Sequence, residues 1–425
     1  MRHLMIFFIF AGLSLTFAAK GSNIELRIRL YDAPEKITVS VKEGLYSLVA
    51  ADPSGNFIDT IWDIHEDDPV RIFYIRRVGT KVEINMKGLG THTFQEIWLV
   101  PHPQNPDPSF IIQGTGRDRW YQDKLHFFVI DNDGKKELTT VNQVAIEKYV
   151  AGVVESEGGR FNQLEYFKAQ AVLARTFAIK NLRKHIRHRY NLRDDVSSQV
   201  YHSRAYLQNA TEIKFAALAT KDTILVDEDG DILLGLFHAN SGGQTANAGD
   251  VWSRDISYLR SKPDPFSVGQ TSYSWTKKIP KADVMKFVTS QIGSSYNPGD
   301  LHKALINFQQ ENRKSHFEFQ NKKIKLTQFR TRFGLRSTFF IIQEEGDFYV
   351  FKGRGFGHGV GLSQDGAINM SASGYSYKEI LYFYFDKTQL ENIFDVLDNN
   401  ESLRKMVIEN AHWLDHGNPS RTASP

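Results

Sequence analysis

The spacing of apolar residues changes about a third of the way along this chain, and that change most constrains its fold. From Asn23 to about Asp133, apolar and polar residues alternate, as in Ile24 to Leu30 and Lys36 to Lys42. A period of two is typical of strands with one buried face. Residues common in turns (Gly, Pro, Asn and Asp) separate these runs. We therefore predict a small β-rich accessory domain over residues 20–138.

A helical pattern follows the alternating region. One face of the first predicted helix carries Ile146, Tyr149, Val150 and Val153, and Gly158-Gly159 ends it. A second helix is expected to begin at Asn162, as N-cap, with Glu165 completing a capping box. Its apolar stripe consists of Leu164, Phe167, Ala171, Ala174 and Ala178. Lys168 and Arg175 lie seven residues apart on this helix and therefore on nearly one face, where spacing alone makes them ordinary surface residues.

Short β-type runs and helical pieces alternate after Asp194. The fold class is therefore α+β, with a mixed domain over residues 139–395 and a polar C-terminal tail, a short helix and a frayed end, over residues 396–425.

The first 19 residues have the pattern of a secretory signal. Basic Arg2 precedes an apolar run from Leu4 to Phe17, and small residues Ala18 and Ala19 follow. The run is shorter than a typical membrane span, although a retained anchor is the alternative. We expect export to the periplasm or cell-wall compartment, with no transmembrane span after signal removal. The sequence has no Cys, which excludes disulfides, cysteine nucleophiles and thiolate metal sites.

Charge and acidic motifs exclude several other classes. The net charge of +3 is small for 425 residues, so nucleic acid is not an expected partner. The basic stretch from Lys180 to Arg193 is interpreted as a solvated helix end, although it could face an anionic polymer such as the cell wall. The acidic run Asp227 to Asp231 predicts a hairpin turn, because Ile232 and His238 occupy positions where a calcium loop needs Gly and Glu. We assign no metal site and expect no cofactor.

Two segments carry candidate chemistry. The glycine-rich run Gly353 to Gly361 contains His358 and leads into Ser363-Gln364-Asp365. It lacks the ending of a phosphate loop and the second glycine of a nucleophile elbow. The other segment is Glu155-Ser-Glu157 at the end of the first predicted helix. Glutamates at helix ends are usually only solvated, so these residues alone do not indicate a catalytic site.

Together these segments resemble the family of stage II sporulation protein D (SpoIID-type), which includes the amidase enhancers. The resemblance runs over most of the chain after about residue 139. Its motifs are Val141-Asn142, 147–154, Ser156-Glu157, 168–171, 174–178, 199–201, 240–243 with Thr245, Trp252, Tyr258-Leu259 and 335–338. The most specific motif is Gly353-Arg-Gly-Phe-Gly-His-Gly-Val-Gly-Leu-Ser-Gln-Asp-Gly-Ala367.

The resemblance implies a SpoIID-like catalytic domain and the activity of a peptidoglycan lytic transglycosylase. Glu157 matches the family's catalytic glutamate. One glutamate suffices for this reaction, because the 6-hydroxyl of N-acetylmuramic acid attacks its own C1 and leaves a 1,6-anhydro end, whereas hydrolases usually need two carboxylates. The substrate is expected to be glycan strands stripped of their stem peptides. Positions matching family motifs, expected to line the glycan groove, are Lys168, Arg175, Tyr201, His358, Ser363 and Gln364.

This sequence departs from the family at two points. Gly158-Gly159 stands where the family often has Met-Pro, and the zinc site of some members needs cysteines that are absent here. Two other functions stay open. One is a non-catalytic modulator of an N-acetylmuramoyl-L-alanine amidase, and the other is a glycan-binding envelope protein with an exposed aromatic strip on the N-terminal domain.

Overall fold

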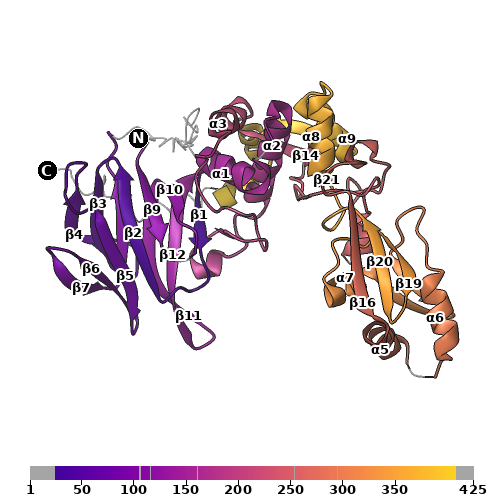
Figure 1. Cartoon of the computed structure of the whole chain (residues 1–425). Coiled ribbons are helices and arrows are strands. Elements are labelled where there is room, and N and C mark those ends of the chain that lie inside the picture. The colour runs from indigo at the N-terminus through magenta and orange to yellow at the C-terminus, as the bar shows by residue number, and fades with distance from the viewer. Residues whose placement is uncertain are drawn as a thin grey trace, which may run out of the picture.

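The computed structural model describes residues 24–407 apart from 105, 106, 115, 160, 253 and 294. The predicted signal of residues 1–19 lies outside the described residues. Twelve strands precede the first helix, a helical unit occupies the middle of the molecule, and a further α/β unit lies beyond it (Figure 1). The chain is thus mixed α and β, as expected. No helix within the described ranges is long and apolar enough to cross a membrane.

The N-terminal strands form a sandwich of two sheets. The seven-stranded sheet has the order β13 (Leu192–Arg193), β1 (Glu25–Leu30), β12 (Lys135–Ala145), β11 (Lys124–Asn132), β8 (Glu96–Pro101), β3 (Tyr46–Ala51) and β4 (Phe57–Ile64). The six-stranded sheet has the order β10 (Arg119–Gln122), β9 (Ser109–Gln113), β2 (Lys36–Glu43), β5 (Ile72–Val78), β6 (Lys81–Met86) and β7 (Gly90–Phe94). The predicted alternation is confirmed in β5, where Phe73 and Ile75 are buried and Tyr74 is exposed.

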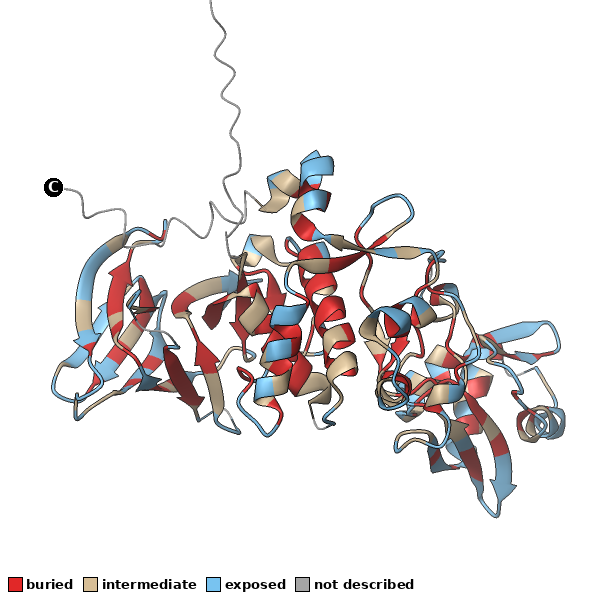
Figure 2. Ribbon diagram, turned by 90° about the horizontal axis from the view of Figure 1, so that it is seen from above, coloured by how far each residue is buried: buried red, intermediate tan, exposed pale blue. Residues whose placement is uncertain are grey.

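The predicted boundary after residue 138 is misplaced. Strand β12 continues to Ala145, pairs antiparallel with β1, and ends only one residue before α1 (Ile146–Gly158). One hydrophobic core also extends from the sandwich into the helices, from Leu26 to Leu403. Figure 2 shows buried residues both in the strands of the sandwich and in the central helices. The β-rich region therefore shares its core with the region that follows.

The central unit packs α1 against α2 (Leu164–Lys180) and α3 (Ala210–Ala219). Fully buried alanines at 169, 171 and 174 allow this close packing. The predicted capping box is wrong: the N-cap of α2 is Gln163, with no side-chain cap bond. The Glu165 carboxylate instead accepts a hydrogen bond from the backbone N–H of Tyr377 (2.8 Å), at the start of α9 (Tyr377–Tyr384), and an ion pair with Lys168 holds its other oxygen.

The rest of the central unit consists of short elements. They are the 3-10 helices η1 (Ile186–His188) and η2 (Pro265–Ser267), strands β14 (Thr223–Asp227), β15 (Phe237–His238), β21 (Leu362–Ser363) and β22 (Thr388–Asn392), and helices α4 (Ala248–Val251), α8 (Gln364–Ala372) and α10 (Ile393–Asn399). The predicted hairpin turn is confirmed, because Val226 bridges Ile232 and the Asp227 carboxylate caps the turn's backbone amides.

The C-terminal tail does not begin at residue 396. That position lies inside α10, and Val396, Leu397 and Leu403 join the main core. An amphipathic pattern too short to recognise in the sequence buries these side chains. The remaining tail, residues 408–425, lies outside the described residues.

A second unit with its own core, which the sequence pattern did not predict, is inserted between β15 and β21. It comprises β16 (Ser274–Pro280), α5 (Lys281–Ile292), α6 (Pro298–Ile306), β17 (His316–Phe319), β18 (Lys322–Lys325), α7 (Leu326–Phe333), β19 (Phe340–Glu345) and β20 (Phe348–Arg354). Its core is rich in aromatic residues, and the ring of Phe340 contacts those of Phe329 and Phe351. Figure 1 shows this inserted unit at the far side of the helices from the sandwich.

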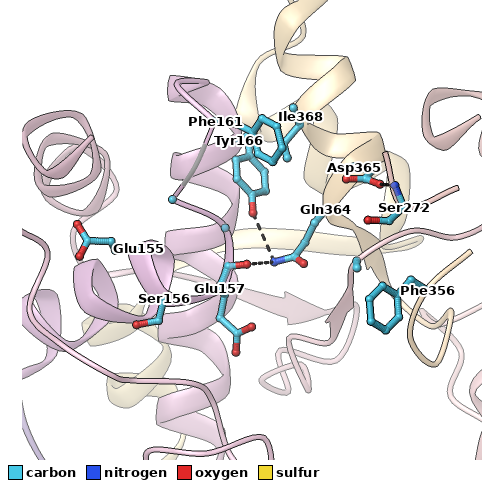
Figure 3. A pocket seen from close by; sticks show the side chains of 13 residues that line it. Glu155, Ser156, Glu157, Phe161, Tyr166, Ser272, Phe356, Gln364, Asp365 and Ile368 are labelled. Atoms are coloured by element: carbon cyan, nitrogen blue, oxygen red, sulfur yellow. Dashed lines mark hydrogen bonds between the residues drawn. The ribbon is translucent and has the colours of Figure 1, made fainter. Parts of the chain in front are cut away.

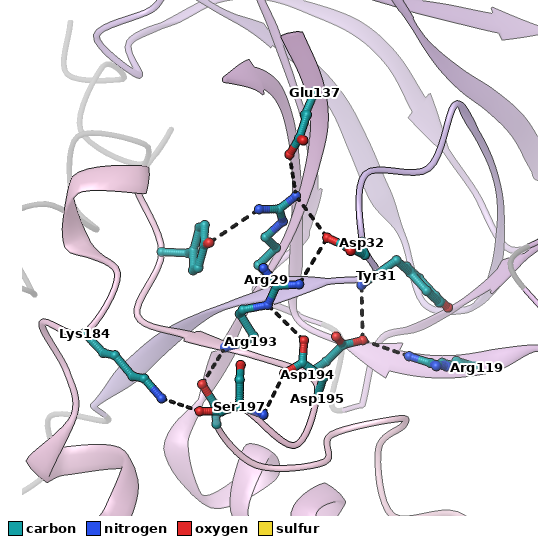
Figure 4. A network of polar contacts seen from close by, with 12 residues as sticks. Arg29, Tyr31, Asp32, Arg119, Glu137, Lys184, Arg193, Asp194, Asp195 and Ser197 are labelled. Atoms are coloured by element: carbon teal, nitrogen blue, oxygen red, sulfur yellow. Dashed lines mark hydrogen bonds and ion pairs between the residues drawn. The ribbon is translucent and has the colours of Figure 1, made fainter. Parts of the chain in front are cut away.

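Ion pairs fasten the segment after α2 to the sandwich (Figure 4). Asp194 accepts hydrogen bonds from Arg119 Nη1 (2.8 Å) and from the backbone N–H of Tyr31 (3.1 Å). Arg193 pairs with Asp195 (2.9 Å). Arg193, the last cation of the basic stretch, is therefore paired with an acid, while Lys180, Arg183, Lys184 and Arg187 are exposed. These contacts fix the chain just before residue 200, where the candidate site begins.

Candidate active site

The end of α1 presents three consecutive polar side chains to one loop. Glu155 Oε1 accepts hydrogen bonds from the backbone N–H groups of Tyr206 and Leu207 (2.9 Å each). Ser156 Oγ accepts from His202 N (3.1 Å) and Glu157 Oε1 from Val200 N (2.9 Å). All three acceptors are therefore held by main-chain donors of residues 200–207.

Helix geometry separates the two glutamates. Residues two apart point about 200° away from each other around a helix. Figure 3 shows this divergence, with Glu155 turned away from Gln364 and Glu157 on the side of α8 and Phe356. Glu155 is 9% exposed, and one of its carboxylate oxygens accepts both hydrogen bonds from the backbone of residues 206–207. Glu157 is the half-buried member of the pair.

A cavity of about 350 Å³ lies where α1 meets α8 and the glycine-rich run. Its walls are residues 155–159, Phe161, Tyr166, Ala239, Ser272, Phe356, Gln364, Asp365 and Ile368. Polar groups and two exposed aromatic rings, Phe161 and Phe356, thus surround the space beside Glu157. Such a mixture suits a ligand with many hydroxyl groups and apolar ring faces.

Gln364 joins the two sides of this cavity. It is the first residue of α8, whose N-cap is Ser363. Its Nε2 donates to the backbone oxygen of Glu157 (3.3 Å) and to Tyr166 Oη (3.4 Å), as Figure 3 shows. The predicted groove residue Gln364 is therefore placed beside Glu157, although 207 residues separate them in sequence.

Burial raises the pKa of Glu157 above the ordinary 4.5, and only the hydrogen bond from Val200 opposes that shift. Within the described part of the chain, Glu157 forms no ion pair. A carboxyl group in this environment keeps its proton to higher pH, as a general acid requires. Burial raises the pKa of Glu155 as well, so geometry rather than acidity singles out Glu157.

Glycine at position 158 is required by its neighbour. A Cβ there would lie 1.8 Å from Tyr166 Oη, well inside contact distance. The departure from the family's Met-Pro thus coincides with a tyrosine whose ring fills the space that a side chain at 158 would occupy. Tyr166 therefore helps to set where α1 ends and where Glu157 lies.

We expect Gly158→Ala to destabilise the protein by about 1–3 kcal/mol, the typical cost of overpacking. Unfolding in urea measures this cost. Adding Tyr166→Phe removes the oxygen nearest the new methyl group, and the double variant should recover part of the loss. If both variants unfold at the same urea concentration, the clash does not position α1.

Three predicted groove residues are instead buried and serve the fold. Arg175 is 1% exposed and binds Glu147 through Nε (2.9 Å) and Nη2, because α3 and β14 cover its face of α2. Tyr201 is 1% exposed and donates to Asn142 Oδ1 (2.9 Å). Ser363 is fully buried and caps α8. None of these three side chains lies on the wall of this cavity, and the groove role stays a prediction for them.

The two remaining predicted residues lie outside the cavity wall. Lys168 pairs with Glu165 (2.6 Å). His358 Nδ1 accepts from Val360 N (3.1 Å), and its ring lies 5.1 Å from that of Trp252. Burial lowers the pKa of His358 to about 4, so its ring is neutral at neutral pH. Its ring also contacts that of His238 (5.5 Å), on β15.

Tyr166, Phe161 and Phe356 are wall residues that the sequence pattern did not predict, and Asp365 is a wall residue for which no role was predicted. Asp365 accepts from Asn240 Nδ2 (2.9 Å) and Ser272 N (3.1 Å), and it follows Gln364 directly, which was an available signal. Phe161 and Phe356 gave no signal beyond apolar residues next to polar motifs. Across the described residues, no group of three or more His, Asp or Glu side chains is arranged to hold a metal ion.

The fold and the site define a mixed α/β protein with a buried-acid cavity suited to a polar ligand. A family model described as "Stage II sporulation protein" (SpoIID) matches residues 134–226, which include α1, α2 and Glu157. Stage II sporulation protein D of Bacillus subtilis (strain 168) is 30% identical over 264 residues, covering 59% of this chain and 76% of the relative. The chain belongs to the SpoIID family.

Two further relatives extend the comparison. Stage II sporulation protein D of Bacillus amyloliquefaciens is 30% identical over 259 residues, covering 58% of this chain and 74% of the relative. A protein named "Amidase enhancer" from Bacillus subtilis (strain 168) is 23% identical over 325 residues, covering 61% of this chain and 45% of the relative.

Proposed function

We propose that this protein is a peptidoglycan lytic transglycosylase that cuts peptide-stripped glycan strands between N-acetylmuramic acid and N-acetylglucosamine. The supporting observation is Glu157, a half-buried carboxyl of raised pKa beside a polar cavity with aromatic walls. Because peptidoglycan lies outside the cytoplasm, the proposal includes export directed by residues 1–19. Family membership supports the same assignment.

In this proposal Glu157 acts first as an acid and then as a base. The protonated carboxyl donates its proton to the glycosidic oxygen as the bond to C1 of N-acetylmuramic acid breaks. The 6-hydroxyl of the same sugar attacks C1, and the Glu157 carboxylate accepts the hydroxyl proton. The products are a 1,6-anhydro end and a free 4-hydroxyl on N-acetylglucosamine, and Glu157 is again protonated. Gln364 keeps α1 and α8 together and so positions the acid.

Isotope labelling tests the reaction class. Purified protein is incubated with peptide-stripped strands in water enriched in ¹⁸O, and the products are analysed by mass spectrometry. A transglycosylase gives anhydro ends without label, since no water enters the new end. Labelled reducing ends would make the protein a hydrolase.

The relative named amidase enhancer favours a second candidate function, the stimulation of an N-acetylmuramoyl-L-alanine amidase. The same preparation, mixed with an amidase and intact strands, separates the two functions. Faster release of stem peptides, together with no glycan product from the protein alone, would support a modulator instead of an enzyme.

We expect the activity to fall as pH rises through the pKa of Glu157. Since only the protonated carboxyl can donate, and burial raises its pKa above 4.5, the alkaline limb of kcat/KM must lie above pH 4.5. The measurement is kcat/KM across pH at constant ionic strength. An alkaline limb at or below pH 4.5 would contradict a buried acid at this position.

A further inference from the structure

Four arginines of the inserted unit surround the glycine-rich run without acidic partners. Within the described ranges, none of Arg313, Arg330, Arg336 and Arg354 forms an ion pair with Asp or Glu, whereas arginines such as Arg175 and Arg189 do. Unneutralised cations close together repel one another and create a positive potential that attracts anions. The four arginines therefore favour binding of an anion near the glycine-rich run.

Two of these arginines have clear structural contacts. Arg313 donates to the backbone oxygens of Gln244 and Ser241 (2.6 Å each). Arg313 and Arg354 lie over the ring of Phe339, with guanidinium carbons 4.9 Å and 3.9 Å from its centroid. Burial, followed by the charges of Arg354 and Arg330, lowers the pKa of Arg313 to about 9. These residues hold the cluster in place rather than reach outward.

Arg336 is the exposed member of the cluster, and it lies beside Phe356, a residue of the cavity wall. Its guanidinium carbon lies 5.3 Å from the centroid of the Phe356 ring, and its backbone oxygen accepts from Gly357 N (2.9 Å). Phe356 is 42% exposed and forms part of the cavity wall that also holds Glu157. Figure 3 shows Phe356 across the cavity from α1. An aromatic ring of the cavity wall thus has an exposed guanidinium beside it.

This pairing fits a sugar that carries an acid. The apolar face of a pyranose packs on an aromatic ring, and a guanidinium binds a carboxylate through two parallel hydrogen bonds. In peptidoglycan, N-acetylmuramic acid carries a lactyl group whose carboxyl is an amide while the stem peptide is attached. Removal of the peptide frees it as a carboxylate, which places a negative charge on the lactyl group itself.

We propose that Arg336, beside Phe356, binds the free lactyl carboxylate of N-acetylmuramic acid and so distinguishes peptide-stripped strands from substituted ones. The proposal rests on the function proposed above, because it assigns the substituent that the same cavity recognises. The neighbouring arginines strengthen the site because their positive charges keep the local potential positive.

The test compares Arg336→Gln with the unmodified protein on two substrates. One is peptide-stripped strands, and the other is the same strands with the lactyl carboxylates converted to methylamides. On the carboxylate strands, Arg336→Gln should lower kcat/KM by roughly 10- to 100-fold, as expected for loss of a charge-assisted hydrogen-bonded pair. On the methylamide strands, the variant and the unmodified protein should act equally.

Arg332→Gln is the matched control. Arg332 is also exposed and unpaired among the described residues, and its ring contact is with its neighbour Phe333 (6.0 Å) rather than with the cavity wall. We expect this variant to act like the unmodified protein on both substrates. An equal loss by Arg336→Gln on both substrates would overturn the proposal, because it would mean that Arg336 supports the fold and not carboxylate recognition.

Equilibrium binding keeps the inference separate from the proposed reaction. Protein carrying Glu157→Gln is titrated with the two kinds of strand, so that no cleavage is needed. Tighter binding of carboxylate strands that disappears on adding Arg336→Gln supports the proposal, even if no anhydro product ever forms. Equal binding of both strands overturns it, even if the unmodified protein proves to be a transglycosylase.

Discussion

Replacing Glu157 by glutamine is expected to lower the rate of glycan cleavage by ~10²- to 10⁴-fold, the usual contribution of a positioned acid or base. Glutamine keeps the shape of the side chain and retains an oxygen for the hydrogen bond from Val200, but it has no proton to give to the leaving oxygen. The rate of appearance of anhydro ends measures the effect. Substrate binding and thermal stability should change little.

Glu155→Gln is the control for this experiment. Glu155 sits two residues earlier on the same helix, its pKa is also raised by burial, and its oxygen accepts from Tyr206 and Leu207. Glutamine can keep both of those bonds, so activity should stay close to that of the unmodified protein. A loss in Glu155→Gln equal to that in Glu157→Gln would point to damage at the end of α1 rather than to acid catalysis.

Local sequence patterns predicted the elements that carry the site, and the family resemblance predicted two of its residues. Period-two alternation gave the strands, and helix spacing gave α1 with its end at Gly158. The resemblance singled out Glu157 and Gln364, which the structure brings to one cavity. No local rule relates those two residues, because they meet only through the packing of α8 on the central helices.

Tertiary contacts explain why the structure differs from the roles predicted for Arg175 and Glu165. Arg175 lies on the same face of α2 as Lys168 by spacing, yet Glu147, from a helix earlier in the chain, meets it and α3 buries it. Glu165 has the position of a capping-box residue, but the backbone of Tyr377 competes successfully for its carboxylate. In each case a partner distant in sequence changes the role of a residue whose local pattern was read correctly.

The inserted unit was missed for a related reason. Its edge strand β16 pairs with the central strand β20 through contacts such as Ser274 with Arg354, which are 80 residues apart. Short amphipathic segments of that kind look the same whether they join the main core or form a second one. The core of the inserted unit is distinguished by its aromatic cluster around Phe340. The aromatic content of a sequence does not reveal which rings pack together in the fold.

The largest expected effect on stability comes from Glu96, at the centre of a buried charge network in the sandwich. Both of its oxygens accept from Arg189 (2.5 and 2.9 Å), and His126 Nε2 donates to it (2.7 Å). Arg27 in turn donates to His126 Nδ1 (2.7 Å), which fixes the neutral tautomer. Trp98 stacks on the His126 ring at 3.8 Å. Glu96 is 3% exposed, so water cannot replace any partner that is lost.

We expect Glu96→Ala to lower the free energy of unfolding by about 3–5 kcal/mol, because it removes the buried carboxylate that Arg189 and His126 both bind. Urea denaturation measures the change. The matched control is Glu83→Ala on the same sandwich. Glu83 also binds an arginine through both oxygens, but its partner Arg76 has a side chain 60% exposed to water, so the urea midpoint should hardly move. Equal midpoints for the two variants would show that the buried network adds nothing to stability.

Acid should expose the same network by linkage. Burial alone would raise the pKa of Glu96, but the hydrogen bonds and charges of His126 and Arg189 outweigh it and lower the pKa to about 2. A carboxylate whose folded pKa lies below its unfolded value of 4.5 stabilises the fold above pH 4.5, and this contribution disappears as pH falls towards 2. Burial lowers the pKa of His126 to about 3 in the folded protein. Because the imidazole of the unfolded chain has a pKa of 6.5, protons bind the unfolded state preferentially and destabilise the fold as pH falls below 6.5. Stability measured against pH should therefore fall below pH 6.5 in both proteins, and below pH 4.5 it should fall more steeply in the unmodified protein than in Glu96→Ala.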